Sequence, residues 1–278
     1  MPKVTALKNE LKTVDQLSEM TKILEETAAR DISQMRERIV KSRPYFVEAW
    51  KIYRLLQRLA PEQPNVMNKQ LVVGITPEWG MTGNLLTRVL IRSEELYEHY
   101  EADLLLTGKM GRDRFADRDE RTIHFFNVPK KATYNDIQEL YKTVAKYSQI
   151  HIVYPRFESL SKQTVAVASL STKKAPKDDT EADEDPIDAT RFLIEPDAQS
   201  VVDYMNEIMV GLVIYSYFSE ALLAYSAAQM VAMRSAYDNA KDEHRRLSIK
   251  YNKARREVID SKLRELYESR FVEKGSAL

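Results

Sequence analysis

The histidines are the side chains of this chain whose type most readily suggests metal binding or acid–base catalysis. They stand at His99, His124, His151 and His244, and no two of them are spaced like ligands of one metal ion. Cys is absent, which excludes thiolate metal sites and a Cys nucleophile. His151 lies inside an apolar run and is interpreted as a satisfied core residue, and His244 as a packed one. We expect no metal site and no catalytic residue.

Two glycine-bearing segments follow predicted strands and are candidates for phosphate binding: residues 80–84 (GMTGN) and 108–112 (GKMGR). The N-terminus of a helix there would attract an anion, but neither segment has a P-loop or dinucleotide-binding pattern. We interpret the first as a tight strand-to-helix turn and the second as a turn. Glu195 has no His or carboxylate that the sequence places near it, so no general acid and no cofactor are expected.

Composition narrows the class of protein further. The chain has 278 residues, with 42 Lys plus Arg against 42 Asp plus Glu, so it carries no chain-wide basic field for nucleic acid. Only 7 residues are Gly, which favours long helices. The N-terminus lacks an apolar signal core, and the longest apolar run, residues 208–218, is shorter than the roughly 18–20 residues of a membrane span. We expect a soluble protein without a span.

The first segment has helical periodicity. Leu7, Leu11 and Val14 begin an apolar stripe that Met20, Leu24 and Ala28 continue. This predicts a helix of about 38 residues, a kink or break before Pro44, and a second helix that carries Trp50, Tyr53 and Leu56.

The middle segment changes to strand periodicity. Short apolar runs at residues 71–75, 104–106 and 150–154 alternate with helical stretches at 85–100 and 134–147, which indicates an α/β layer with a largely parallel sheet. Residues 163–170 alternate and predict a further strand, and residues 191–194 are strand-like. Residues 173–188 hold seven acids and three lysines and predict a solvated loop that is dispensable for the fold.

The third segment predicts one helix of about 75 residues, about 110 Å long. Two sets of residues recur every seven positions, which is typical of a coiled coil. They are Leu223, Met230, Tyr237, His244, Tyr251 and Val258, and Ser226, Met233, Ala240, Leu247, Ala254 and Ser261. Because such a rod needs a partner, we predict that the N-terminal helix lies antiparallel to it and that Met233 and Leu247 are buried between them.

A run of cations without an acid lies on this third segment. This basic segment, residues 244–256, contains six cations: Arg245, Arg246, Lys250, Lys253, Arg255 and Arg256. It is either the solvated face of the coiled coil or a surface that meets an acidic partner. Nucleic acid fits less well, because no aromatic residues are interleaved as a base-stacking surface requires.

Two blocks of the third segment resemble the C-terminal signature of the gamma subunit of F-type ATP synthases. They are residues 229–240 (QMVAMRSAYDNA) and 251–255 (YNKAR). Residues 20–22, 43–45, 154–157 and 192–196 are similar to further family segments, so the resemblance spans the chain. The chain departs from the family pattern at residues 77–83, at Gln229, Arg256 and Asp260, and at residues 26–29.

The resemblance implies an antiparallel coiled coil of N- and C-terminal helices (1–60 and 198–278) with an inserted Rossmann-like α/β domain (61–197). It implies the non-catalytic central rotor shaft of an ATP synthase, on the cytoplasmic face of a bacterial plasma membrane. The implied partners are the alpha and beta subunits of the catalytic head, the epsilon subunit and the c-ring. The implied rotor–stator residues are Met20, Thr21, Lys22, Met230, Met233, Arg234, Asp238, Asn239, Tyr251, Asn252, Lys253, Arg255 and Arg256.

Two other classes stay open at this point. A free-standing coiled-coil tether explains the long helices but not the block at residues 229–240. A small-molecule enzyme on the α/β domain would need a cofactor fingerprint, which the sequence lacks. The coupling ion and the preferred direction of catalysis are not encoded in any pattern of the chain.

Overall fold

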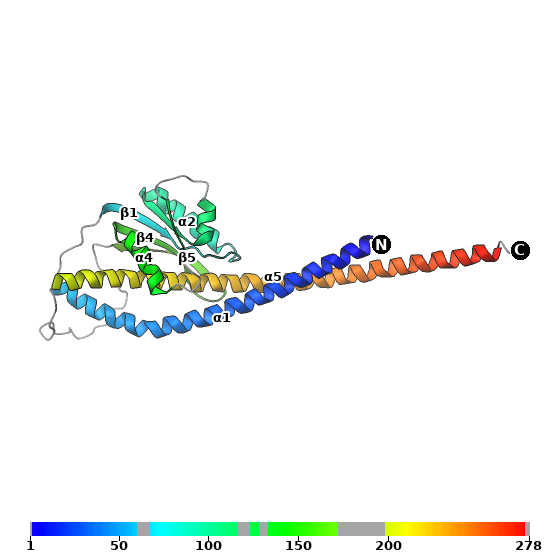
Figure 1. The fold of residues 1–278 in the computed structure, drawn as a ribbon, viewed down its shortest axis with the longest axis horizontal. Helices are drawn as coiled ribbons and strands as arrows, with labels where there is room; N and C mark the ends of the chain where they lie inside the picture. The colour runs from blue at the N-terminus through cyan, green and yellow to red at the C-terminus, as the bar shows by residue number, and fades with distance from the viewer. Residues whose placement is uncertain (1, 60–66, 116–122, 128–132, 172–197, 276–278) are drawn as a thin grey trace. The chain divides into compact units, whose positions relative to one another are not determined.

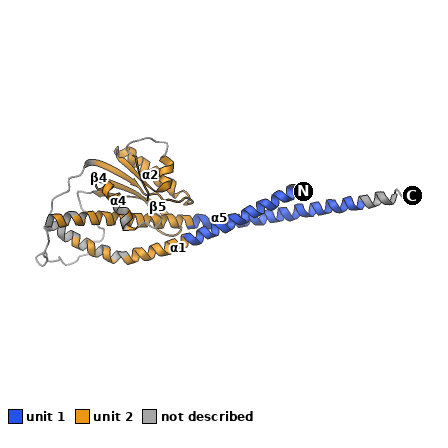
Figure 2. Ribbon diagram, in the orientation of Figure 1, with its two compact units in different colours: residues 1–27, 230–278 blue, residues 28–229 orange. Residues whose placement is uncertain are grey.

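The computed structural model describes residues 2–59, 67–115, 123–127, 133–171 and 198–275. They form two compact units, each described by itself (Figure 2). The helix-pair unit comprises residues 1–27 and 230–278, and the sheet unit comprises residues 28–229. The predicted domain limits at 60/61 and 197/198 fall at residues outside the described ones and stay predictions.

The N-terminal helix α1 is longer than the sequence predicts. It runs from Pro2 to Leu59 over 58 residues and passes through Pro44 without interruption (Figure 1). Proline inside a helix costs about 3 kcal/mol because a hydrogen bond is lost and the ring crowds the preceding turn. The helical residues on both sides offset that cost, so the predicted second helix is a continuation of the first.

The C-terminal helix α5 confirms the predicted rod. It runs from Ala198 to Gly275 over 78 residues. Of the two heptad sets, the one containing Met233, Leu247 and Ala254 is the more buried, with 5–7% of each of these residues exposed.

A five-stranded sheet forms the centre of the sheet unit, in the order β3-β2-β1-β4-β5. The strands are β1 (Met67–Gly74), β2 (Asp103–Thr107), β3 (Ile123–Phe126), β4 (Tyr147–Phe157) and β5 (Gln163–Ser171). Each pairing among β1 to β4 is parallel, and β5 is antiparallel to β4. The predicted α/β class with a largely parallel sheet is therefore confirmed, including the strand over residues 163–170, whereas β3 was not predicted.

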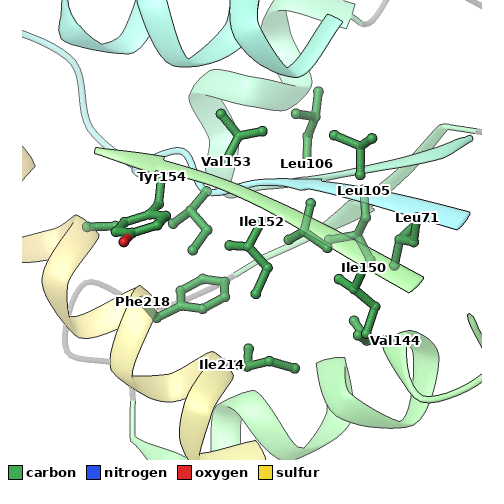
Figure 3. Packing of buried hydrophobic residues seen from close by; sticks show 14 of the residues in the cluster. Leu71, Leu105, Leu106, Val144, Ile150, Ile152, Val153, Tyr154, Ile214 and Phe218 are labelled. Carbon is green, nitrogen blue, oxygen red and sulfur yellow. The ribbon is translucent and has the colours of Figure 1, made fainter. Parts of the chain in front are cut away.

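Helices cover both faces of this sheet (Figure 1). On one face Ile152 of β4 and Phe218 of α5 point toward each other (Figure 3). On the other face lies α2 (Leu85–Tyr100), which approaches so closely at Gly74 that a Cβ there would lie 2.7 Å from the Ser93 hydroxyl oxygen. The core includes side chains from the strands, α2, α3 (Gly108–Phe115), α4 (Tyr134–Val144) and α5.

Helix α3 (Gly108–Phe115) corrects the prediction of a turn at residues 108–112. Glycine at 108 and 111 lowers the intrinsic helix propensity. Two contacts from another loop start the helix nonetheless: the Lys109 N–H donates to the Glu78 carboxylate (3.2 Å), and the Met110 N–H donates to the Pro77 carbonyl (3.3 Å).

Part of α5 is long and apolar enough for a membrane span, whereas the sequence analysis expected no such segment. The stretch Glu207–Tyr267 is long and apolar enough to cross a bilayer, with a mean hydropathy of 1.5 over its most apolar window. However, 61% of that window is buried inside the structure, and core helices meet the same criterion. The apolar character of this stretch is thus accounted for by packing.

Candidate functional site

The carboxyl edge of the parallel strands is where an α/β fold usually holds a ligand, and here Thr76 and Thr107 on that edge bond to each other. The Thr76 N–H donates to the Thr107 hydroxyl (3.0 Å), the Thr76 hydroxyl donates to the Thr107 carbonyl, and the Thr107 hydroxyl also lies 3.2 Å from the Thr76 carbonyl. Residues 80–84 form a strand-to-helix connection, as predicted, although the whole segment from Ile75 to Asn84 is longer than a tight turn. The first candidate phosphate loop therefore connects β1 to α2.

The core histidine is satisfied as predicted. His151 is 3% exposed, and its Nδ1 and Nε2 each lie 3.0 Å from a partner, the Ser169 hydroxyl and the Gln70 side-chain oxygen. Tyr100 stacks on its ring at 4.2 Å. Burial lowers the pKa of His151, because the charged imidazolium loses hydration. His244 is half-buried on α5.

Among the residues that the structure describes, no three His, Asp or Glu side chains are grouped so that they could hold a metal ion. Glu195 and residues 173–188 and 191–194 lie outside the described residues.

The helix-pair unit carries the residues that sequence reasoning singled out. Met233, Leu247 and Ala254 of α5 are buried in this unit, whose other element is residues 2–27 of α1. This confirms the predicted burial of Met233 and Leu247. On α1 the predicted stripe holds at Leu24, which is half-buried, and at Ala28, which is buried. It is wrong at Met20, which is 50% exposed, whereas the neighbouring Thr21 is half-buried. The Thr21 hydroxyl bonds to the carbonyls of Leu17 and Ser18 in its own helix (2.9 and 3.0 Å).

All thirteen predicted rotor–stator residues fall in this one unit, although they come from opposite ends of the chain. Met233 is buried, and Thr21, Met230 and Tyr251 are half-buried. The others expose their side chains: Met20, Lys22, Arg234, Asp238, Asn239, Asn252, Lys253, Arg255 and Arg256. The unit thus presents an exposed polar surface over a narrow apolar seam.

Arg234 links the two helices of the pair. Its guanidinium lies 3.5 Å from the Glu25 carboxylate of α1 and 3.4 Å from the Asp238 carboxylate one turn along α5. It also lies 5.8 Å from the centre of the Tyr237 ring. Arg234 is more than half exposed, so each ion pair contributes about 0–1 kcal/mol, and the pairs are exchangeable.

The basic segment is exposed along its length. All six of its cations are exposed, and Arg246 lies 3.7 Å from the Glu243 carboxylate, just outside the segment. Beyond it, α5 exposes apolar side chains that the sequence analysis did not single out. They are Ile259 (46%), Leu263 (47%), Leu266 (63%) and Tyr267 (64%). Their spacing of three and four residues was the available signal, because it places them on one face of a helix.

Comparisons with known proteins agree along the whole chain. A family profile described as ATP synthase matches residues 3–269. The chain is 27% identical to the ATP synthase gamma chain of Burkholderia pseudomallei, over 94% of this chain and 96% of that one. It is 23% identical to the ATP synthase gamma chain of Chloroherpeton thalassium, over 96% of each.

Solved structures share the fold. The rotor of the Euglena gracilis mitochondrial ATP synthase matches with a TM-score of 0.65 at 18% identity, over 93% of this chain and 99% of that one. A chain of the OSCP/F1/c-ring structure of the same enzyme matches with a TM-score of 0.69 at 17% identity, over 96% and 93%. Since the family profile covers nearly every residue, the chain belongs to the family of ATP synthase gamma chains.

Proposed function

We propose that this chain is the central rotor shaft of an F-type ATP synthase, which couples ion flow through a membrane ring to ATP synthesis or hydrolysis in a catalytic head. The observation that carries the proposal is the pair of long helices from opposite chain ends, within a chain that matches gamma chains along its length. Its partners are the alpha and beta subunits of the head, the epsilon subunit and the c-ring. A free-standing tether is not favoured, because its relatives would not be gamma chains over 94% of the sequence.

The helix-pair unit is the part that meets the head. A helix that exposes Ile259, Leu263 and Leu266 on one face gains free energy when an apolar surface covers it. The surrounding residues of the predicted interface are polar and exposed, and they form weak ion pairs such as Arg234–Glu25. This combination suits a shaft that must stay centred yet turn, because weak polar contacts exchange readily.

The basic segment is the part of this surface that faces acidic groups of the head. Arg255, within the family block, and Arg256, beside it, are both exposed and available for such pairs. Opposite charges guide assembly and are screened beyond about 8–10 Å. We propose that the thirteen rotor–stator residues contact the head, because they share one unit and most of them expose polar side chains.

The chain itself performs no catalysis and lies peripherally, on the cytoplasmic face of a bacterial plasma membrane, as part of the complex. The hydrogen bonds between Thr76 and Thr107 at the carboxyl edge of the sheet support the absence of catalysis, because they occupy polar groups that a ligand would otherwise contact.

Co-purification tests the function. The tagged full chain is expected to bring down the head subunits and the ring subunit in stoichiometric amounts, and the complex is expected to hydrolyse ATP. The pure chain alone is expected to hydrolyse none. Recovery with unrelated proteins would favour a tether, and turnover by the pure chain that a mutation within it abolishes would favour an enzyme.

A further inference from the structure

Methionine supplies all of the sulfur in this chain. The sequence has 10 Met and no Cys, so an oxidant that reacts with sulfur finds only thioethers. Exposure decides which of them it reaches, because a buried sulfur is shielded from a dissolved oxidant. Met20 and Met81 are exposed, with 50% and 53% of each residue accessible. The other methionines whose side chains the structure describes are buried or half-buried: Met35, Met110, Met205, Met209, Met230 and Met233.

Met81 also has an unusual backbone conformation. It lies in the loop between β1 and α2 with a φ of 64°, in the left-handed region, which is unfavourable for a residue that has a Cβ. The other non-glycine residue with positive φ in the described part of the chain is Glu101. There the conformation ends α2, and the Glu101 N–H bonds to the carbonyls of Glu98 and Tyr97. Met81 ends no helix, so its conformation depends on how the loop is held.

The loop is held on both sides of Met81. Before it, the Glu78 carboxylate accepts a hydrogen bond from the Lys109 N–H at 3.2 Å, which ties the loop to α3. After it, Thr82 is 3% exposed, and its carbonyl accepts the Leu85 N–H at 3.4 Å. A backbone rotation that turned the Met81 side chain inward would have to break these contacts. The thioether of Met81 is therefore kept in contact with solvent.

We propose that Met81 is a reversible oxidation site of this chain, with hydrogen peroxide as the oxidant. A lone pair of the thioether sulfur attacks one peroxide oxygen, the O–O bond breaks, and the sulfur keeps that oxygen as a sulfoxide while the other oxygen leaves as water. The sulfur loses two electrons and the peroxide gains them. A methionine sulfoxide reductase reverses the change with two electrons from a dithiol, which becomes a disulfide, and the oxygen leaves as water.

A reversible modification requires that the oxidised chain stays folded. An exposed sulfoxide at Met81 removes no buried contact, whereas a sulfoxide at Met209, which is 0% exposed, would place a polar group in the core. Met20 is as exposed as Met81, but it belongs to the surface proposed to face the catalytic head. Met81 lies in the sheet unit, which contains none of the thirteen rotor–stator residues. The distinction between Met20 and Met81 in the assembled complex rests on the proposed function.

The test exposes the pure full chain and the complete complex to dilute hydrogen peroxide and follows sulfoxide formation by mass spectrometry. Trypsin cleaves after Lys and Arg, so Met20, Met35 and Met81 are each the sole methionine of a tryptic peptide, over residues 13–22, 31–36 and 70–88. In the pure chain, Met20 and Met81 are expected to react at least about fivefold faster than the half-buried Met35. In the complex, Met81 is expected to keep its rate, and Met20 to slow at least about fivefold because the head covers it.

Two controls accompany the rates. Met81→Leu keeps an apolar side chain without sulfur, so peptide 70–88 of this variant is expected to gain no oxygen. A gain there would place the reaction on Trp79 of the same peptide and overturn the proposal. Methionine sulfoxide reductase with dithiothreitol is expected to restore the unmodified peptide in the wild-type chain. The urea midpoint of Trp fluorescence, which reports on the sheet unit, is expected to stay unchanged after oxidation of Met81.

Oxidation of Met81 no faster than that of Met35 in the pure chain would overturn the proposal. Protection of Met81 in the complex would also overturn it, because the site would then be covered in the assembled protein, and so would a sulfoxide that the reductase does not remove. Failure of the proposed function looks different. The chain would then form no complex, and Met20 would keep the rate of the pure chain, while Met81 would still react as expected.

Discussion

Replacing Leu247 with Asp tests the helix pair most directly. Leu247 is 6% exposed, and in its unit it is covered by residues 2–27 of α1. Losing the burial of a leucine costs about 1.5–3 kcal/mol, and the carboxylate must be dehydrated or protonated in its place. We expect the free energy of unfolding of this unit to fall by about 3–5 kcal/mol, a large share of the 5–15 kcal/mol typical of a domain.

The matched control lies two residues away. Ile249 is on the same helix but is 65% exposed, so Ile249→Asp is expected to change stability by no more than about 0.5 kcal/mol. Both variants of the full chain are unfolded in urea and followed by far-ultraviolet circular dichroism. The two Trp residues, Trp50 and Trp79, belong to the sheet unit, so their fluorescence should keep its midpoint in Leu247→Asp. Equal dichroism midpoints for the two variants would refute the helix pair.

Three further predictions concern other parts of the molecule. Gly108 and Gly83 both have positive φ (73° and 62°), which costs about 1–2 kcal/mol for alanine. Of the two, only Gly108 would bring the added Cβ against another atom, the Thr76 carbonyl oxygen at 2.5 Å. In thermal unfolding, Gly108→Ala is therefore expected to destabilise the chain by at least about 2 kcal/mol, about 1 kcal/mol more than Gly83→Ala. Burial lowers the pKa of His151 in the folded state, so the stability that neutral His151 contributes is complete above its unfolded pKa of about 6.5 and is lost as the pH falls toward the folded pKa. His151→Gln should therefore flatten the stability-versus-pH curve in this range. An unchanged slope would contradict the lowered pKa of His151. Arg255→Glu should lower coupled ATP turnover of the complex more than Lys146→Glu, a reversal of an exposed charge in the sheet unit, and equal turnover of the two would leave the basic segment as a solvated face.

Periodicity in the sequence was enough to predict the long elements. The heptad spacing of Met233, Leu247 and Ala254 follows from helix geometry alone, and these residues are buried as that spacing predicts. Strand β1 and its parallel neighbours β2 and β4 could be predicted because buried strands are short apolar runs. The general class of the fold therefore came from local patterns.

The errors arose where distant residues decide the local structure. Helix α3 starts because Glu78, 31 residues before Lys109, accepts its N–H, and no window around Gly108 contains that information. Met20 was placed on the buried stripe because methionine is apolar, whereas the helix turns Thr21 inward. The hydrogen bond from the Tyr225 hydroxyl to the Ile75 carbonyl was not predicted, because the two residues are 150 positions apart and a tyrosine in an apolar run is typical of ordinary core.

The two segments of the helix-pair unit are synthesised at different times, because they are far apart in the sequence. Residues 1–27 leave the ribosome well before their partner in this unit, which begins at residue 230. At about 5–20 residues per second, the N-terminal helix waits roughly 10–40 s before its neighbour exists. During that interval Leu7, Leu11 and Val14 have no surface of this unit to pack against. A ribosome that stalls before residue 230 releases a fragment in which residues 1–27 lack their partner in this unit.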